Sequence, residues 1–298
     1  MADRRRTLLV DAFTQRPLTG NAAGVVPDAT GLSEDQMRAI ARELAVSETA
    51  FILDSETADR AVRYFTPEQE VDLCGHATIA SHAYLAAENV IDPGTHTLET
   101  AVGVLEIEVT SDHVIWMTQD EPSVREIAVD VETVAEALDL PLGAVSEMEL
   151  PIAVASTGLP FLVVPVTFLE PLGNAAPDMS AIADLAERFD AIGIYAFTFD
   201  ALEAESTLHG RCFVPGAGVP EDPVTGTASG ATGAYLKRVD AFETFPEEMR
   251  FEQGHFLDRP GTVQVQVDDR VRVGGTAVRT LDGELAVPPD ETDEIIDA

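Results

Sequence analysis

An internal repeat constrains the fold of this chain more than any other feature of the sequence. The segment CGHATIASHAYL (74–85) aligns with TGTASGATGAYL (225–236) at an offset of 151 residues (225 − 74), and the shared residues include a glycine and a closing Ala-Tyr-Leu. Upstream, RYFTP (63–67) and RCFVP (211–215) share an Arg-x-Phe-x-Pro frame, followed by a loop that is three residues longer in the second copy. Two matches in the same order indicate a duplication, so we expect two similar halves.

Each copy of the repeat predicts a helix made mostly of small residues. Ala, Gly, Ser and Thr dominate both segments, and the helices are expected to start at Gly75 and Gly226. A helix with such short side chains must be closely surrounded by other elements, and a curled sheet does this most simply. The sequence therefore predicts an α+β fold of two pseudo-symmetric domains, each a curled, mostly antiparallel and barrel-like β-sheet around one central helix.

Local patterns along the chain set the expected boundaries. The segment 33–45 begins with the capping-box pattern Ser33 to Gln36 and has helical apolar spacing. The segment 95–119 alternates as strands of an antiparallel meander do. We expect a first domain over 1–120, a connecting segment over 121–150, a second domain over 151–287 and an acidic tail over 288–298, with the alternative that the last strands return to the first domain.

The chain is strongly acidic. Its 18 Lys and Arg residues against 53 Asp and Glu residues give a formal net charge of −35. Such a charge destabilises a compact state by self-repulsion, which salt at about 1 M screens to a Debye length of about 3 Å. We therefore predict a halophilic protein from a high-salt cytoplasm, with an acidic protein of ordinary salinity as the alternative. Nucleic-acid binding is not expected, because phosphate contacts need clustered Lys and Arg.

The sequence also predicts a cytoplasmic protein that does not enter the membrane. It contains no run of about 18 apolar residues, which is the length that a membrane-spanning helix needs. Its two cysteines, Cys74 and Cys212, do not form a disulfide framework and suit a reduced cytoplasm.

The two predicted helix starts are candidate ligand sites. A helix N-terminus presents unpaired backbone N–H groups and partial positive charge, and a glycine there lets an anion approach the backbone closely. Two such starts, one from each half, suit a small carboxylate-bearing molecule bound in a cleft between the domains. The ionisable and polar residues around them are Cys74 and His76 in the first copy, and Glu221, Asp222, Thr225 and Thr227 in the second.

Cys74 allows more than one interpretation. The pair Cys74 and His76 lacks a second pair of Cys or His ligands, so no metal site is expected. A thiol at a helix N-terminus has a lowered pKa, which suits a nucleophile or a base. The favoured alternative is that Cys74 is a small buried residue.

Longer motifs give the chain a family resemblance. They are VDAFTQRPLTGNAAGVV (10–26), MRAIARELAVSETAFI (37–52), RYFTPEQEVDLCGHATIASHAYL (63–85), RCFVPGAGVPEDPVTGTASGATGAYL (211–236), QGHFLDRPG (253–261) and VRVGGTAV (271–278). Together they resemble the phenazine-biosynthesis PhzF-like isomerases, which have the diaminopimelate epimerase fold. The resemblance implies a duplicated fold, a homodimer, and no metal or organic cofactor.

The resemblance also implies roles for individual residues. Glu48, in the motif VSETAF, corresponds to the catalytic acid and base of the family. Inside a closed apolar cleft the pKa of such a carboxyl would rise, which suits proton transfer. Backbone N–H groups at the two helix starts would bind a carboxylate or a developing oxyanion. The implied substrate-binding residues are Asn21, Gly75, His76, Asp222, Thr225, Gly226 and Thr227.

We therefore expect a cofactor-independent isomerase that moves a proton within a small carboxylate substrate. Fold relatives that racemise amino acids use two opposed cysteines, whereas the repeat places Thr225 opposite Cys74. A threonine hydroxyl cannot replace a thiolate near neutral pH, so two-thiol epimerisation is disfavoured. The alternatives are a one-thiol epimerase or dehydratase that uses Cys74, and a non-catalytic protein that binds small acids.

Overall fold

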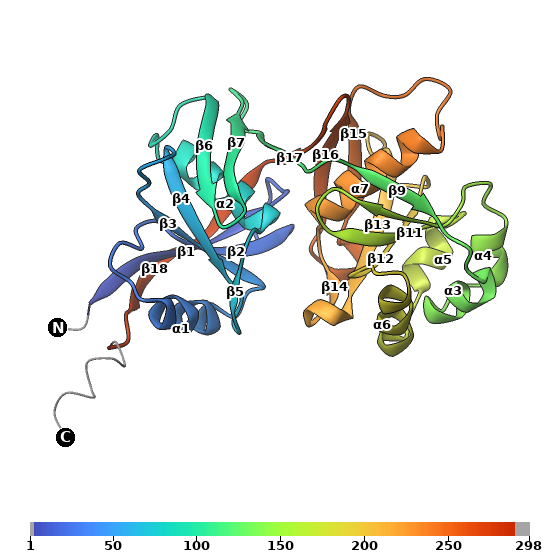
Figure 1. Ribbon diagram of the computed structural model, residues 1–298, viewed down its shortest axis with the longest axis horizontal. Coiled ribbons are helices and arrows are strands. Elements are labelled where there is room, and N and C mark those ends of the chain that lie inside the picture. The colour runs from blue at the N-terminus through green and yellow to red at the C-terminus, as the bar shows by residue number, and fades with distance from the viewer. Residues whose placement is uncertain (1–2, 290–298) are drawn as a thin grey trace. The chain divides into compact units, whose positions relative to one another are not determined.

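The computed structural model describes residues 3–289, apart from the side chain of Ala217. The chain forms two compact units (Figure 1). Unit 1 comprises Met1–Met117 and Gly275–Ala298, and unit 2 comprises Thr118–Gly274. Within the described residues, no helix is both long and apolar enough to span a membrane.

Unit 1 is built on a curled, mostly antiparallel sheet. Neighbouring strands pair antiparallel, except that β2 with β3 and β4 with β6 are parallel. A short strand, β5 (Glu70–Val71), pairs with the end of β4. In spatial order the strands are β18 (Ala277–Ala286), β1 (Arg4–Ala12), β2 (Asn21–Val26), β3 (Glu48–Leu53), β4 (Arg60–Phe65), β6 (Gly94–Thr100), β7 (Gly103–Val109) and β8 (Ile115–Thr118).

The sheet of unit 1 encloses the helix α2 (Gly75–Ala87). This helix contacts β18, β1, β2 and β3 from one part of the strand order and β7 from the other, so the sheet curls around it (Figure 1). Every side chain from Ala77 to His82 is buried. The short side chains of the repeat therefore allow the sheet to approach the helix on all sides, as the sequence predicts.

The helix α1 (Glu34–Leu44) covers the other face of the unit 1 sheet. Its N-cap is Ser33, which forms the expected capping box with Gln36. The apolar stripe of α1 packs against Phe51 of β3 and Phe65 of β4. The amphipathic spacing in the sequence thus predicts both the helix and the face that it buries.

Unit 2 repeats the strand order of unit 1. Its neighbouring strands are antiparallel, except that β11 with β12 and β13 with β15 are parallel, and the short β14 (Val219–Asp222) pairs with the end of β13. In spatial order the strands are β9 (Ser123–Glu126), β10 (Ala153–Ser156), β11 (Pro160–Pro165), β12 (Gly193–Thr198), β13 (Leu208–Val214), β15 (Met249–Gln253), β16 (Gly261–Val267) and β17 (Val271–Gly275).

The central helix of unit 2 is α7 (Gly226–Arg238). It contacts β9, β10 and β11 on one side and β16 on the other. The packing is close, because a Cβ placed on Gly233 would lie 2.7 Å from Cγ1 of Val265. The outer face carries α3 (Val131–Ala137), α4 (Leu142–Ser146), α5 (Leu169–Asn174) and α6 (Met179–Arg188), and two single-turn helices complete the unit, η1 (Pro215–Ala217) and η2 (His255–Leu257).

Each unit is thus a curled, mostly antiparallel sheet around one central helix, which confirms the predicted fold class. The unit boundaries differ from the expected ones. Residues 121–150 are part of unit 2, because β9 pairs with β10 and because α3 and α4 pack in its apolar core. The strand β18 pairs with β1 and returns to unit 1. Of the expected acidic tail, 290–298 lie outside the described residues.

The Arg-x-Phe-x-Pro frame of the repeat forms the same bidentate ion pair in both units. Arg63 donates from Nε to Oε1 of Glu70 at 2.6 Å, and Arg211 donates from Nε to Oε1 of Glu221 at 2.8 Å. A second N–H of each arginine reaches the other carboxylate oxygen. Each guanidinium also lies over the phenylalanine two residues further along its strand. The duplication therefore preserves a polar anchor as well as the central helix.

His82, in the middle of α2, gives unit 1 an expected sensitivity to acid. Its Nδ1 lies 3.0 Å from the carbonyl oxygen of Thr78, and its side chain is 2 % exposed. Burial lowers the pKa of His82 to about 4, from 6.5 in an unfolded chain. Because the unfolded state takes up the proton first, this group stabilises the fold fully above pH 6.5, and that contribution is lost as the pH falls towards 4.

We expect this loss to reach about 3 kcal/mol of unfolding free energy by pH 4. Urea unfolding followed by the fluorescence of the single tryptophan, Trp116 in unit 1, measures it at pH 7, 5 and 4 in constant salt. The variant His82→Gln serves as control, because it keeps an N–H donor for Thr78 but does not titrate. A decline of equal size in both proteins would contradict the prediction.

Candidate active site

Glu48, Cys74 and His76 form one cluster in unit 1. Glu48 is the first residue of β3, Cys74 is the N-cap of α2, and His76 lies in the first turn of that helix. The Nε2 atom of His76 lies 3.5 Å from Oε2 of Glu48, and its Nδ1 atom lies 3.4 Å from Sγ of Cys74. The structure therefore places a carboxylate, an imidazole and a thiol within reach of one another.

The cluster is partly open to solvent. The side chain of Glu48 is 24 % exposed and that of His76 is 11 % exposed, so a small molecule can reach both. Ser47 adds a hydroxyl whose Oγ atom lies 3.4 Å from Nε2 of His76. The sequence motif contains this serine, but residue patterns alone gave it no role, because its proximity to His76 depends on how β3 meets α2.

The start of α2 leaves room beside Gly75. Apart from Gly75 itself, its two chain neighbours and the backbone of the same helix, no described atom lies within 4 Å of the position that a Cβ on Gly75 would occupy. Behind the helix start, Thr78 donates to the carbonyl oxygen of Cys74 at 2.7 Å, and the hydroxyl of Tyr64 lies 2.6 Å from that of Thr78. Burial raises the pKa of Tyr64, so this phenol stays neutral. These contacts hold the first turn rigidly while the side of Gly75 remains approachable by an anion.

Asn21 lies at the same end of the sheet as Glu48. It is the first residue of β2, and Ala23 of that strand pairs with Glu48 of β3. Side chains two residues apart point to the same face of a strand, so Asn21 and Ala23 share the face on which Glu48 lies. Asn21 is buried.

A second cluster of predicted site residues lies at the start of α7 in unit 2. The Thr225 hydroxyl donates a short hydrogen bond to Oδ2 of Asp222. Gln253 of β15 donates to this hydroxyl at 3.2 Å and to the carbonyl oxygen of Asp222 at 2.7 Å, and it accepts from the Thr225 backbone N–H at 3.1 Å. The buried amide of Gln253 thereby fixes the helix start, a role that the sequence did not reveal because 28 residues separate it from Thr225.

The other residues at this helix start have defined surroundings. Gly226 and Thr227 open α7, and the carbonyl oxygen of Thr227 accepts from Thr157 at 3.3 Å. Glu221, a candidate in the sequence, belongs instead to the ion pair with Arg211. Burial raises the pKa of the neighbouring Cys212 thiol, which keeps it unreactive. The predicted residues thus gather into two clusters, each assembled inside its own unit.

Comparison with known proteins identifies the family. The model of the PhzC-PhzF family, described as phenazine biosynthesis-like protein, matches residues 10–283. The chain belongs to this family. It is 37 % identical over 281 residues to the uncharacterized isomerase YfhB of Bacillus subtilis, an alignment that covers 91 % of this chain and 95 % of the relative. The trans-2,3-dihydro-3-hydroxyanthranilate isomerase of Pseudomonas chlororaphis is 30 % identical, with the same coverage of 91 % and 95 %.

Solved structures agree with this assignment. The crystal structure of a PhzF-family phenazine biosynthesis protein from Bacillus anthracis matches with a TM-score of 0.87 and 34 % identity, over 96 % of this chain and 100 % of that chain. A hydroxyproline epimerase from Agrobacterium vitis shares the fold, with a TM-score of 0.60 at 13 % identity over 98 % and 95 % of the two chains. The chain is therefore an isomerase of the PhzF family with an epimerase-like fold.

The Glu48 cluster of this PhzF-family chain also has the residue types of a metal site. One ligand atom from each of Glu48, Cys74 and His76 lies within 4.8 Å of the others. The contact between Sγ of Cys74 and the imidazole of His76 does not require a metal, because a hydrogen bond between the thiol and a ring nitrogen explains it equally well. The expectation that the enzyme needs no metal stays a prediction.

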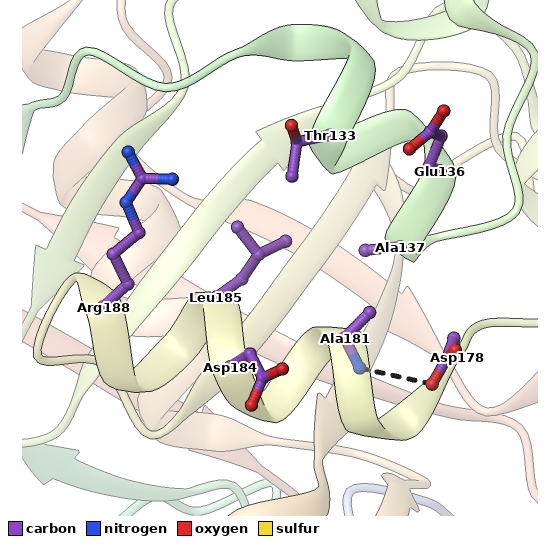
Figure 2. Close-up of a pocket in the computed structure, with 8 residues that line it drawn as sticks. All are labelled: Thr133, Glu136, Ala137, Asp178, Ala181, Asp184, Leu185 and Arg188. Carbon is purple, nitrogen blue, oxygen red and sulfur yellow. Dashed lines mark hydrogen bonds between the residues drawn. The ribbon is translucent and has the colours of Figure 1, made fainter.

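A hollow of about 400 Å³ lies elsewhere on this PhzF-family chain, on the outer side of unit 2 (Figure 2). Figure 2 shows Thr133 of α3 facing Leu185 of α6 across it. It contains none of the residues that the family resemblance implicates, so we assign it no role in the reaction. Its lining residues are Thr133, Glu136, Ala137, Asp178, Ala181, Asp184, Leu185 and Arg188.

Proposed function

We propose that the chain is a cofactor-independent isomerase in which Glu48 moves a proton within a small carboxylate-bearing molecule. The observation that carries the proposal is the partly exposed carboxylate of Glu48, held 3.5 Å from His76 beside the open start of α2. A carboxylate in such a place has access to a ligand and a neighbouring group that can share its proton.

The reaction is a transfer of one proton in two steps. Glu48 removes a proton from a carbon next to a carbonyl or a double bond, so the C–H bond breaks and its electron pair enters the conjugated system. The protonated Glu48 then returns the proton to another carbon of that system, which restores the carboxylate. Negative charge that develops between the two steps is stabilised by the N–H groups of Gly75 and His76 at the start of α2.

We assign recognition of polar ligand groups to residues around the two helix starts. In unit 1 these are Asn21, Gly75 and His76. In unit 2 the backbone N–H groups of Gly226 and Thr227 offer an anion site, and the hydrogen bonds among Asp222, Thr225 and Gln253 keep that helix start in place. The relative in Pseudomonas chlororaphis is named for a hydroxyanthranilate, which bears a carboxylate. This name supports a carboxylate-bearing substrate for the present chain.

A second candidate function rests on the thiol of Cys74. Its Sγ atom lies 3.4 Å from Nδ1 of His76, so the imidazole can take the thiol proton and generate a thiolate. A one-thiol epimerase or dehydratase would use this pair in place of Glu48. Cys74 and His76 lie in the same cluster as Glu48, so variants of single residues are needed to distinguish the two candidate functions.

Incubation in deuterated water tests both proposals. The purified chain is mixed with trans-2,3-dihydro-3-hydroxyanthranilate and with a panel of small unsaturated acids, and products are followed by NMR. We expect an isomerised product from at least one acid, from both wild type and Cys74→Ala, with solvent deuterium at the new C–H position to the extent that protonated Glu48 exchanges its proton with solvent before returning it. Loss of the reaction in Cys74→Ala alone would favour the thiol mechanism. Tight binding of an acid without isomerisation or deuterium incorporation would indicate a non-catalytic binding protein.

A further inference from the structure

We propose that unit 2 holds a transition-metal site whose protein ligands are the imidazoles of His209 and His255, with Glu252 orienting His209. These residues lie apart from the Glu48 cluster in the chain, and the proposed reaction does not use them. His209 belongs to β13, Glu252 to β15, and His255 opens η2. One ligand atom from each lies within 4.8 Å of the others.

The pair His209 and Glu252 is fully enclosed. The two residues are direct neighbours in the parallel pairing of β13 with β15, and both side chains are 0 % exposed. Nδ1 of His209 lies 2.8 Å from Oε1 of Glu252. The carboxylate also accepts from the backbone N–H groups of Leu202 at 2.6 Å and Glu203 at 3.0 Å, so its orientation is fixed.

This hydrogen bond determines where the lone pair of His209 points. When Nδ1–H donates to the carboxylate, the neutral imidazole carries its unshared electron pair on Nε2. Among the described residues, this buried Nε2 has no hydrogen-bond partner, and neither does the buried Nδ1 of His255. The centroids of the two rings are 5.2 Å apart. Two buried ring nitrogens without partners in one place are costly, and a shared cation satisfies both.

The donor set selects the class of metal. Neutral imidazole nitrogen suits Zn²⁺, Co²⁺, Ni²⁺ and copper, whereas Mg²⁺ and Ca²⁺ prefer oxygen ligands. An imidazole that binds metal through one nitrogen commonly donates through the other to a carboxylate, which is the relation of His209 to Glu252. A Zn–N bond of roughly 2.0–2.1 Å places two nitrogens bound to one ion about 3–4 Å apart, which is compatible with ligand atoms that lie within 4.8 Å of one another.

The position of His255 gives a metal access from solvent, and it links metal binding to the stability of unit 2. His255 is only partly buried, so a cation can reach the site from solvent. It follows Gln253 by two residues, and Gln253 makes the hydrogen bonds that hold Thr225 at the start of α7. A cation bound to His209 and His255 ties η2 to β13, and because it binds the folded state it raises the thermal stability of unit 2.

The test uses Co²⁺ as a spectroscopic probe on the untagged full chain. We expect one Co²⁺ per chain with visible absorption bands of nitrogen coordination, displacement by Zn²⁺, and no displacement by excess Mg²⁺. The variant His255→Asn should lose the bands, whereas Cys74→Ala/His76→Asn should keep them, because its changes lie at the other cluster. Glu252→Gln should weaken binding by about 10- to 100-fold if its carboxylate orients His209.

Several results would overturn the proposal. These are the absence of Co²⁺ bands in wild type, unchanged binding in His255→Asn, and loss of binding in Cys74→Ala/His76→Asn. Imidazole NMR of wild type with added Zn²⁺ gives a readout that needs no variant, since the six histidines report individually. Shifts confined to His209 and His255 support the site, and shifts centred on His76 contradict it. Neither outcome depends on the isomerase activity.

Discussion

Replacing Glu48 with Gln lowers the rate of isomerisation by about 10²- to 10⁴-fold, which is the usual contribution of a positioned general acid or base. The amide has nearly the shape of the carboxylate, so its contacts beside Ser47 and His76 are preserved while its ability to take up a proton is lost. We therefore expect kcat to fall far more than KM changes. Steady-state kinetics on the acid identified by the deuterium experiment measure both constants.

A matched control separates this effect from a general loss of negative charge. Glu56→Gln makes the same chemical change at an exposed position of unit 1 and should leave kcat unaltered. The variant Glu48→Asp keeps the carboxylate but draws it back from the reacting carbon, so an intermediate rate is expected. Equal rates for wild type and Glu48→Gln would remove Glu48 from the mechanism, and normal activity in Glu48→Gln with none in Cys74→Ala would assign catalysis to the thiol.

The fold was predictable because local residue patterns and the internal repeat indicate its central helices and several of its boundaries. Small residues mark the two central helices, which begin at Gly75 and Gly226 as expected. A capping box marks the start of α1 at Ser33. The membership of 121–150 in unit 2 was harder to foresee. The strand β9 is short, mostly exposed and without a strong alternating pattern, so this segment resembled a connection. Pairing with β10 makes it a strand.

The sequence indicated individual residues of the candidate site but not the contacts between residues far apart in the chain. Family resemblance indicated Glu48 as catalytic and His76 as substrate-binding, and the structure brings these two together. Both roles stay predictions, as do the homodimer and the high-salt setting. The role of Gln253 in holding the start of α7 was not predicted. Its contact with Thr225 depends on the pairing of β13 with β15, which the spacing of these residues in the sequence does not indicate. The pairing of His209 with Glu252 was missed for the same reason.

The two repeat arginines provide the other large expected effect, because they make the same ion pair in different surroundings. In unit 2 the side chains of Arg211 and Glu221 are 8 % and 12 % exposed, and Arg211 also donates to the carbonyl oxygens of Leu172 and Ala175. In unit 1 those of Arg63 and Glu70 are 33 % and 32 % exposed. Water can therefore replace the partner of Glu70 but has little access to Glu221.

Arg211→Leu is accordingly expected to destabilise unit 2 by about 3–5 kcal/mol, since it leaves a buried carboxylate without its partner. Arg63→Leu should cost unit 1 only about 0–1 kcal/mol, as exposed ion pairs usually do. Because the units can unfold separately, each needs its own probe: Trp116 fluorescence in urea follows unit 1, and hydrogen exchange in β13 follows unit 2. The double variant Arg211→Leu/Glu221→Leu should recover much of the loss, since no charge stays buried alone. Similar losses for Arg211→Leu and Arg63→Leu would show that burial does not set the strength of these pairs.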